Sequence, residues 1–468
     1  MFEISHHNRE NRQRLKGASV AVLGAARSGI ALAELLASAG ARVLLSEQKS
    51  RAATPFSGDE IALPGVSVEF GGHSERVLES DLICISPGIP LAVPALVRAR
   101  ERGIPILGEL EVSSWFCPAP VIAITGSNGK TTTTQLTGEI FKQRFERVLV
   151  GGNIGSPLAA EIRRLPDPQA VILEVSSFQL ETIANFRPRV AVIMNLSPNH
   201  LDRYPDYESY VQAKLQILRS MEEEDLLIYC ADDEFLSRRI AASRPQKIPF
   251  SISRELQAGA FWRKDAIEIR WQRLNLHIPV QRTLLRGPHN RYNMAAAALL
   301  GTLHGIPANA IRGVLENFPG VEHRLEAVRT IEGVQFVNDS KATTVASLGY
   351  ALQSFREPII LIAGGKDKGG DFSEINELLK KHARAVIVIG EASRRMAEAW
   401  ERVVPVYQAA SLEEAVSRSR ALARPGEVVL LSPACSSFDM FRDYEERGRR
   451  FKELVKKMNV LEGGFMVL

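Results

Sequence analysis

A glycine-rich turn that carries a lysine and several threonines is the strongest chemical signal in the chain. It lies between an apolar segment, VIAIT, and a segment with helical character. Glycines let backbone N–H groups approach phosphate oxygens, and a helix N-terminus adds positive potential. Lys130 could reach the β- and γ-phosphates of a nucleotide, and the Thr131 hydroxyl could ligate Mg²⁺. Ile124 stands where the standard phosphate loop has its first glycine, yet the context favours phosphate binding over a chance turn. The candidate residues are Gly126, Ser127, Asn128, Gly129, Lys130, Thr131 and Thr132.

A carboxylate and an imidazole follow two further apolar segments. Glu174 ends AVILEV, and His200 comes shortly after VAVIMNL. An acidic residue at the carboxyl end of a strand, beside a phosphate loop, is where such sheets hold a magnesium ligand. A solvated strand-end carboxylate and a structural histidine are the alternatives. Lys214 lies on an ordinary amphipathic helix, so physical reasoning alone predicts a surface position for it.

Two other regions could bind anions. Gly24-Ala-Ala-Arg-Ser-Gly29, with Glu47 at the end of the next strand, is nearly a dinucleotide fingerprint. Its middle glycine is replaced by Ala26, so an ordinary turn and a nucleotide site are equally compatible with it, and a full NAD site is less so. The polar run 338–344 and the glycine loop 364–370 suit either a helix start or an anionic ligand.

These residues need parallel strands to position them, and the sequence repeats the order apolar strand, glycine-containing loop, amphipathic helix. That order is typical of α/β architecture, and 468 residues suggest about three domains. We predict domains over 1–112, 113–318 and 319–468, each built on a mainly parallel sheet with flanking helices. The first and third are expected to be Rossmann-like, and the central one to be a P-loop-type ATPase domain.

The predicted elements follow from apolar runs and helical periodicity. Strands are predicted at 19–24, 42–47, 81–86, 104–107, 121–125, 170–175, 190–196, 226–230, 334–337, 358–363, 385–389 and 427–431. Helices are predicted at 28–39, 290–304, 308–317, 372–382 and 412–423. Alternating polar and apolar residues over 258–280 predict an antiparallel appendage, and Phe318-Pro-Gly320 predicts a linker.

The composition limits the class of protein. A net charge of +4, from 58 basic and 54 acidic residues, is too small to favour a nucleic-acid partner. Four scattered cysteines without a CxxC pair give little support to a metal-thiolate or redox centre. The polar N-terminus and the lack of a long apolar run predict a cytoplasmic protein without membrane insertion.

Several segments together resemble the Mur ligases of peptidoglycan synthesis, and in particular the branch that adds D-glutamate. The resemblance covers essentially the whole chain from Gly24 onward. It rests on GSNGKTT together with GGNIGSP, EVSSFQL, NHLDRY, HNRYN, NDSKAT and SPACSSFD. It implies an ATP-dependent and Mg²⁺-dependent amide ligase, acting on UDP-N-acetylmuramoyl-L-alanine and D-glutamate through an acyl phosphate. A monomer is expected.

The resemblance also implies roles for individual residues. Lys130 would contact the γ-phosphate, Thr131 and Glu174 would hold one Mg²⁺, and His200 with a carbamylated Lys214 would serve a second. Carbamylation would turn an ammonium, which cannot bind a cation, into an oxygen ligand. The implied ATP contacts are Asn290, Asn293, Arg324 and Asp339. The implied substrate contacts are Arg27, Ser28, Glu47, Ser86 and Gly88 for UDP, Asn153 for the muramoyl-alanine portion, and Thr343, Lys368, Ser437, Phe438 and Tyr444 for D-glutamate.

Three alternative functions stay open on the sequence. A sister Mur ligase or a folylpolyglutamate synthase-like ligase would share GSNGKTT and differ in the amino acid added. The Gly24 loop with Glu47 could belong to an NAD-dependent oxidoreductase, although Ala26 argues against this. A non-catalytic nucleotide-binding scaffold would not need Lys130, Glu174 and His200 together.

Overall fold

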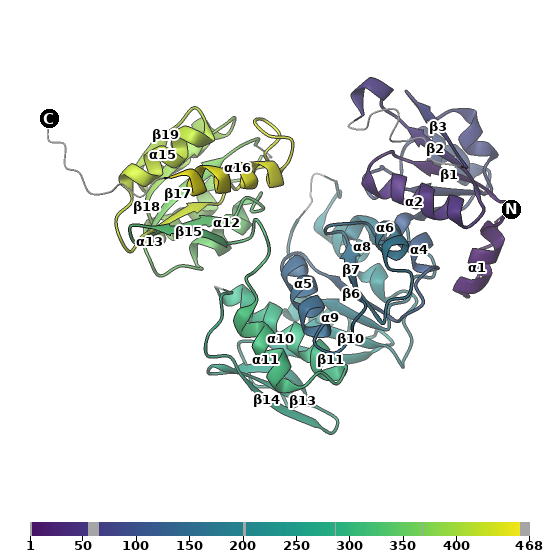
Figure 1. The fold of residues 1–468 in the computed structure, drawn as a ribbon, viewed down its shortest axis with the longest axis horizontal. Helices are drawn as coiled ribbons and strands as arrows, with labels where there is room; N and C mark the ends of the chain where they lie inside the picture. Colours follow the sequence, from purple (N-terminus) through teal and green to yellow (C-terminus); the bar gives the residue numbers. More distant parts are fainter. Residues whose placement is uncertain (1, 55–64, 200–202, 286, 368, 459–468) are drawn as a thin grey trace. The chain divides into compact units, whose positions relative to one another are not determined.

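Three β-sheets flanked by helices organise the chain (Figure 1). The computed structural model describes residues 2–54, 65–199, 203–285, 287–367 and 369–458. These residues form two compact units: 1–281 with 292–316, which holds the first two sheets, and 282–291 with 317–468, which holds the third. The predicted α/β class with three mainly parallel sheets is confirmed.

The first sheet is parallel throughout, with the strand order β3-β2-β1-β4-β5. Its central strand is buried on both faces, as expected for an apolar run covered by helices on either side. The strands are β1 Ser19–Leu23, β2 Arg42–Glu47, β3 Val66–Phe70, β4 Leu82–Ile85 and β5 Ile106–Gly108; the helices are α1 Asn8–Leu15, α2 Arg27–Ser38, α3 Pro94–Glu101 and α4 Glu109–Ser114.

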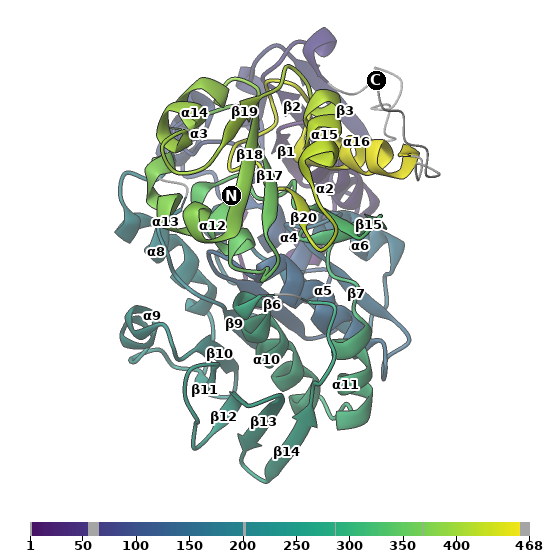
Figure 2. The same ribbon diagram turned by 90° about the vertical axis from the view of Figure 1, so that its left-hand side faces the viewer.

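The central sheet has the strand order β14-β13-β12-β11-β10-β9-β6-β8-β7. The segment from β7 to β12 is parallel, whereas β12, β13 and β14 pair antiparallel and extend the sheet beyond β11 (Figure 2). This confirms the predicted appendage. The strands are β6 Val121–Thr125, β7 Val148–Gly152, β8 Ala170–Glu174, β9 Val190–Ile193, β10 Leu226–Cys230, β11 Gln246–Ser251, β12 Gly259–Arg263, β13 Ala266–Trp271 and β14 Leu274–Pro279.

Most of the helices that accompany the central sheet connect its strands, including the strands that carry the candidate residues. Because β8, β6 and β9 are parallel neighbours, their carboxyl ends lie at one edge of the sheet. The helices are α5 Lys130–Phe141, α6 Leu158–Arg164, α7 Ser177–Leu180, α8 Tyr207–Leu215, α9 Glu234–Arg239, α10 Pro288–Leu303 and α11 Ala308–Asn317.

The third sheet has the order β15-β16-β20-β17-β18-β19, and only β15 runs antiparallel. Its strands are β15 Glu326–Ile331, β16 Val334–Asn338, β17 Ile359–Gly364, β18 Ala383–Ile389, β19 Val406–Gln408 and β20 Val428–Leu431. Its helices are α12 Val345–Leu352, α13 Asn376–His382, α14 Ser393–Trp400, α15 Leu412–Leu422 and α16 Tyr444–Lys457.

Two predicted elements differ from the structure. The strand predicted over 190–196 ends at Ile193, because the following residues turn to bind the glycine-rich loop. The helix predicted over 372–382 consists of a 3₁₀ turn, Phe372–Ile375, followed by α13. None of the described helices is long and apolar enough to cross a membrane.

Candidate active site

Neighbouring atoms lie so close to two glycines of the loop after β6 that a side chain would not fit at either position. Gly126 has φ of 144°, and a Cβ there would lie 2.9 Å from the Cβ of Met194. Gly129 has φ of 85°, and a Cβ there would lie 2.5 Å from Oδ1 of Asn293. L-residues rarely adopt such φ values, so both positions need glycine. The loop is therefore packed tightly against the strand beside it and against α10.

Hydrogen bonds from the segment after β9 hold this loop in shape. The Ser127 amide donates to the Asn195 carbonyl at 2.9 Å, and the Ser127 hydroxyl donates to the Ser197 carbonyl at 2.9 Å. The Asn128 amide donates to Oδ1 of Asn195 at 2.9 Å, and Nδ2 of Asn195 donates to the Asn128 carbonyl at 3.1 Å. Tyr210 OH lies 3.0 Å from the Ser127 hydroxyl. Asn195 and Ser197 were not predicted as site residues, because their role depends on which strands are neighbours.

Lys130 begins α5 and lies over the loop. Its ammonium donates to the carbonyls of Gly126 at 2.9 Å and Ser127 at 3.0 Å. Thr131 and Thr132 are buried in the first turn of the helix. This arrangement, with a helix N-terminus and a lysine beside a glycine loop, suits the phosphates of a nucleotide.

Glu174, at the end of β8, is 2% exposed. Its Oε1 accepts a hydrogen bond from Nδ2 of Asn153 at 2.8 Å. Its Oε2 is buried and has no hydrogen-bond partner among the described residues. A buried carboxylate oxygen without a donor is costly unless a cation compensates it, so this oxygen fits a metal ligand. Asn153, predicted as a substrate contact, lies against this carboxylate.

The surface position that physical reasoning predicts for Lys214 is wrong. Its side chain, on α8, is 2% exposed, and Nζ lies 4.8 Å from the ring centroid of Tyr210. Burial lowers the pKa of Lys214 well below its usual value, and the charge of Lys130 lowers it further, whereas Glu174 raises it. The structure therefore brings Lys130, Glu174 and Lys214 together. His200 lies outside the described residues.

The predicted UDP residues gather at the carboxyl ends of β1, β2 and β4. The Glu47 carboxylate accepts the amides of Ala25 at 2.7 Å and Lys49 at 2.9 Å, which ties the end of β2 to the loop after β1. The Ser86 hydroxyl donates to the Gly24 carbonyl at 3.3 Å. A Cβ on Gly29 would lie 1.8 Å from that same carbonyl oxygen, so this fingerprint glycine is required. Arg27 and Ser28 open α2, and Gly88 lies in the turn after β4.

The predicted residues of the C-terminal unit surround the ends of β16 and β20. Oδ2 of Asp339 accepts from the Ser432 hydroxyl at 2.9 Å, and Oδ1 accepts from the Leu325 amide at 3.2 Å. Burial raises the pKa of Asp339 to about 7, although these bonds and the charge of Arg324 oppose the shift. Thr343 is half-buried, Ser437 is buried, Phe438 is 68% exposed, and Tyr444 begins α16. Lys368 lies outside the described residues.

The raised pKa of Asp339 predicts a pH-dependent stability. The folded state binds the proton more tightly than the unfolded state, so the stabilisation is present below pH 3.8 and is lost as pH rises through 7. We expect the stability of the protein, relative to an Asp339→Asn variant, to fall across this window. Thermal denaturation of both proteins at a series of pH values measures it, and a constant difference between them would contradict the assignment.

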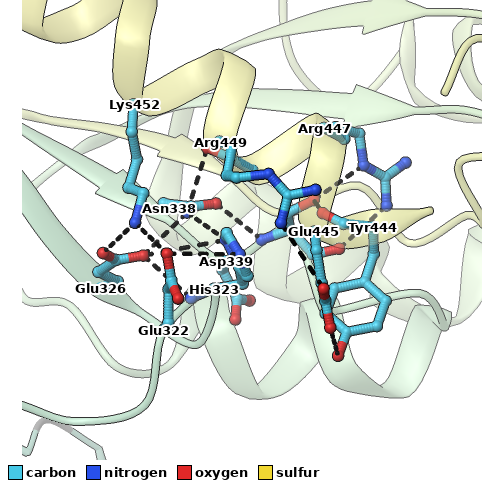
Figure 3. Close-up of polar contacts among 12 residues, drawn as sticks. Glu322, His323, Glu326, Asn338, Asp339, Tyr444, Glu445, Arg447, Arg449 and Lys452 are labelled. Atoms are coloured by element: carbon cyan, nitrogen blue, oxygen red, sulfur yellow. Dashed lines mark hydrogen bonds and ion pairs between the residues drawn. The ribbon is translucent and has the colours of Figure 1, made fainter. Parts of the chain in front are cut away.

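Arg447 is a buried residue that sequence reasoning missed (Figure 3). Its guanidinium donates to the hydroxyl and the carbonyl of Ser340, both at 3.0 Å, and to the carbonyl of Cys435 at 3.1 Å. Weaker bonds reach the carbonyls of Gly364 and Ser436. Burial lowers the pKa of Arg447 to about 10. This one side chain ties α16 to the segments that carry Asp339 and Ser437.

We expect Arg447→Met to destabilise the C-terminal unit by about 3–5 kcal/mol, because several buried carbonyls lose their donor. The matched control is Arg449→Met on the same helix, whose side chain is 48% exposed and only loosely paired with carboxylates. Its loss should change stability by no more than about 0.5 kcal/mol. Urea denaturation compares the two variants, and equal effects would contradict the role of Arg447.

Glu322, His323 and Glu326 form a carboxylate–imidazole cluster (Figure 3). Arg324 directly follows His323 in the sequence. The Lys452 ammonium lies between the two carboxylates, at 2.5 Å from Glu322 and 2.9 Å from Glu326. Nδ1 of His323 is 2.9 Å from Nδ2 of Asn338. The single ammonium therefore offsets one of the two carboxylate charges. The Glu326 carboxylate also accepts the His323 amide at 3.0 Å, which fixes the backbone next to Arg324.

Comparison with known proteins gives a consistent result along the chain. Residues 18–108 match the Mur ligase MurD-like N-terminal domain, 124–301 the Mur ligase middle domain, and 323–435 the Mur ligase glutamate ligase domain. The UDP-N-acetylmuramoylalanine--D-glutamate ligase of Salinibacter ruber is 43% identical over 451 residues, which cover 93% of this chain and 97% of the relative. The ligase of the same name from Koribacter versatilis is 44% identical, with 95% and 98% covered.

Solved structures share the fold at low sequence identity. The UDP-N-acetylmuramate-alanine ligase of Thermotoga maritima superposes with a TM-score of 0.60 at 20% identity, covering 94% of this chain and 99% of that one. The MurF ligase of Thermotoga maritima in complex with ADP gives a TM-score of 0.60 at 16% identity, covering 95% and 97%.

Fold and site together suit a nucleotide-dependent α/β enzyme, with a glycine-rich loop and a lysine at the carboxyl edge of its central sheet. The chain belongs to the Mur ligase family, and it is an ATP-dependent ligase. Ligases of this family use ATP and Mg²⁺. Membership of this family rules out the NAD-dependent oxidoreductase and the non-catalytic scaffold that the sequence had left open.

Proposed function

We propose that this ligase joins the amine of D-glutamate to the alanine carboxylate of UDP-N-acetylmuramoyl-L-alanine, with cleavage of ATP to ADP and phosphate. The observation that carries the proposal is the convergence of Lys130, Glu174 and Lys214 beside the glycine-rich loop. The choice of substrates is supported by near full-length relatives of 43–44% identity that bear this name. A cytoplasmic, monomeric enzyme belongs to the same proposal.

The loop and its surroundings supply the nucleotide site. We assign the phosphates to the amides of the loop and to Lys130. Thr131 and Glu174 would hold one Mg²⁺, and His200 with Lys214 a second, and these ions would neutralise charge on the phosphates. The unpartnered Oε2 of Glu174 supports the first assignment. Asn293 is assigned to the nucleotide because it packs against Gly129 and accepts from Thr133.

Lys214 serves the proposed metal site only after modification. Burial beside Lys130 favours the neutral amine, which is the form that attacks carbon dioxide. The resulting carbamate would carry negative charge next to the Lys130 ammonium and would offer oxygen to a cation. The lowered pKa therefore supports the carbamate that the family resemblance implies.

The remaining roles rest on the family resemblance and form part of the same proposal. They concern Arg27, Ser28, Glu47, Ser86 and Gly88 for UDP, Asn153 for the muramoyl-alanine portion, Asn290, Arg324 and Asp339 for ATP, and Thr343, Lys368, Ser437, Phe438 and Tyr444 for D-glutamate.

The chemistry proceeds in two transfers. An oxygen of the alanine carboxylate attacks the γ-phosphorus, the bond from that phosphorus to the ADP oxygen breaks, and an acyl phosphate forms. The neutral amine of D-glutamate then attacks the acyl carbon, its nitrogen releases a proton to solvent, and phosphate leaves with the former carboxylate oxygen. Lys130 and the loop amides spread the charge of the transferring phosphoryl group, which is where most of the catalysis of this class resides.

Single-substrate omission with phosphate detection tests the proposal. Release of phosphate should require the muramoyl-alanine nucleotide, D-glutamate, ATP and Mg²⁺ together. Among acceptor amino acids, D-glutamate should give by far the highest rate. A higher rate with another amino acid would assign the chain to a sister ligase, and phosphate release without the UDP substrate would contradict the proposed acceptor.

A further inference from the structure

A cavity of about 880 Å³ opens at the amino-terminal edge of the central sheet. Its walls include Val121, which begins β6, and Arg189, which directly precedes β9. They also include Arg219 and Arg244, which come before β10 and β11 in the sequence. The glycine-rich loop follows the other end of β6. The cavity and the phosphate loop therefore lie at opposite edges of the sheet. The five residues of β6 separate them by roughly 15 Å.

The cavity has an excess of positive charge. Five guanidiniums line it, those of Arg9, Arg187, Arg189, Arg219 and Arg244. Three carboxylates pair with some of these guanidiniums. Arg244 contacts Glu222 at 3.0 Å. Arg187 and Arg189 each contact Asp225 at 2.7 Å, and each also pairs with Glu224. Five cations against three anions leave two positive charges uncompensated.

The two uncompensated charges can be placed. Arg219 donates to the carbonyl of Ile183 at 3.3 Å, which is a neutral partner. Within the part of the chain that the structure describes, neither Arg9 nor Arg219 has a carboxylate partner. His6 and His7 also line the cavity. A planar guanidinium binds phosphate through two parallel hydrogen bonds, so two guanidiniums that are not paired with carboxylates suit a doubly charged group.

The walls of the cavity are held rigidly. The Glu111 carboxylate is buried, and one of its oxygens accepts the amides of Ala184, Asn185 and Phe186 at 2.8–3.1 Å. Its other oxygen accepts from the indole of Trp115. Helix α1 also begins at the cavity, with no side chain capping its N-terminus, and Asn8 and Arg9 of its first turn line the cavity. The uncapped N-terminus adds positive potential to that of the arginines.

We propose that this cavity binds a phosphate-bearing small molecule, through a phosphomonoester or diphosphate group held by Arg9 and Arg219. The site is separate from the phosphate loop, and it does not depend on the proposed ligase reaction. Its volume is in the range of small-molecule sites in proteins.

Titration calorimetry with inorganic pyrophosphate tests the proposal in the full chain. A Lys130→Ala background removes the main cation of the phosphate loop, so that remaining binding reports on the cavity. In this background we expect one binding event, weakened about tenfold or more when Arg9→Ala and Arg219→Ala are added. Both side chains are exposed, and an unchanged thermal midpoint verifies that the variants are folded.

The matched control adds Arg12→Ala and Arg238→Ala to the same background. These arginines are also exposed, one on α1 and one on α9, and neither lines the cavity. The control loses the same charge, so its affinity for pyrophosphate should stay within about twofold of the background. Equal weakening in both double variants, unchanged affinity after loss of Arg9 and Arg219, or no binding in the Lys130→Ala background would each overturn the proposal.

Discussion

Replacing Lys130 by alanine should reduce ADP formation by about a thousandfold or more, because a cation beside the transferring phosphoryl group stabilises charge that is greatest in the transition state. The ammonium lies over the loop, within hydrogen-bond distance of the Gly126 and Ser127 carbonyls. A rate assay for ADP release at saturating substrates measures the loss. The predicted UDP residues lie on the first sheet, so affinity for the muramoyl-alanine nucleotide should stay nearly unchanged.

A matched control for this experiment is Lys142→Ala, twelve residues further along the chain. Lys142 follows the same helix, but it is exposed, and its ion-pair partner among the described residues is Glu139. Its loss should leave the rate of ADP release within about twofold of the unmodified enzyme. A comparable rate for Lys130→Ala and Lys142→Ala would show that the loop after β6 is not the phosphate site.

Activity should depend on carbon dioxide through Lys214. We expect purging of dissolved carbon dioxide to lower the turnover rate and added bicarbonate to restore it, because the buried neutral amine must be carbamylated to serve the metal. Lys214→Ala should lose about a hundredfold or more of activity and should no longer respond to bicarbonate. Parallel turnover assays of the two proteins, with and without bicarbonate, measure both effects.

A structural role for Lys214 would give another pattern. Lys214→Met keeps the length and the apolar stem of the side chain but cannot form a carbamate. If this variant retained most of the activity, or if the unmodified enzyme were insensitive to carbon dioxide at every magnesium concentration, the proposed metal-binding role of Lys214 would be wrong.

Local patterns were sufficient to predict a glycine-rich loop between a strand and a helix. The apolar run of β6, the two glycines and the threonine-rich start of α5 are contiguous in sequence, so strand, turn and helix could be read directly. The same holds for the hairpin extension β12–β14, where polar and apolar residues alternate and the strands pair antiparallel. The short edge strands β3 and β19 were missed, because they are partly exposed and lack an apolar run.

Burial that depends on distant segments could not be predicted. Lys214 looks like a surface lysine on its own helix, and only the neighbourhood of Lys130 and Glu174 explains its lowered pKa. Arg447 lies in the strongly charged sequence EERGRR, which by itself suggests an exposed helix. Its acceptors come from residues 340, 364, 435 and 436, which the third sheet brings together.

The central claim is that the terminal phosphoryl group of ATP, bound at the loop after β6, moves onto the alanine carboxylate. Labelling both oxygens of that carboxylate with heavy oxygen tests this most directly, with mass spectrometry of the phosphate released in a single turnover. The account predicts one labelled oxygen in each phosphate, because the leaving group carries the former carboxylate oxygen. Phosphate that contains only unlabelled oxygen, while the amide product still forms, would contradict it.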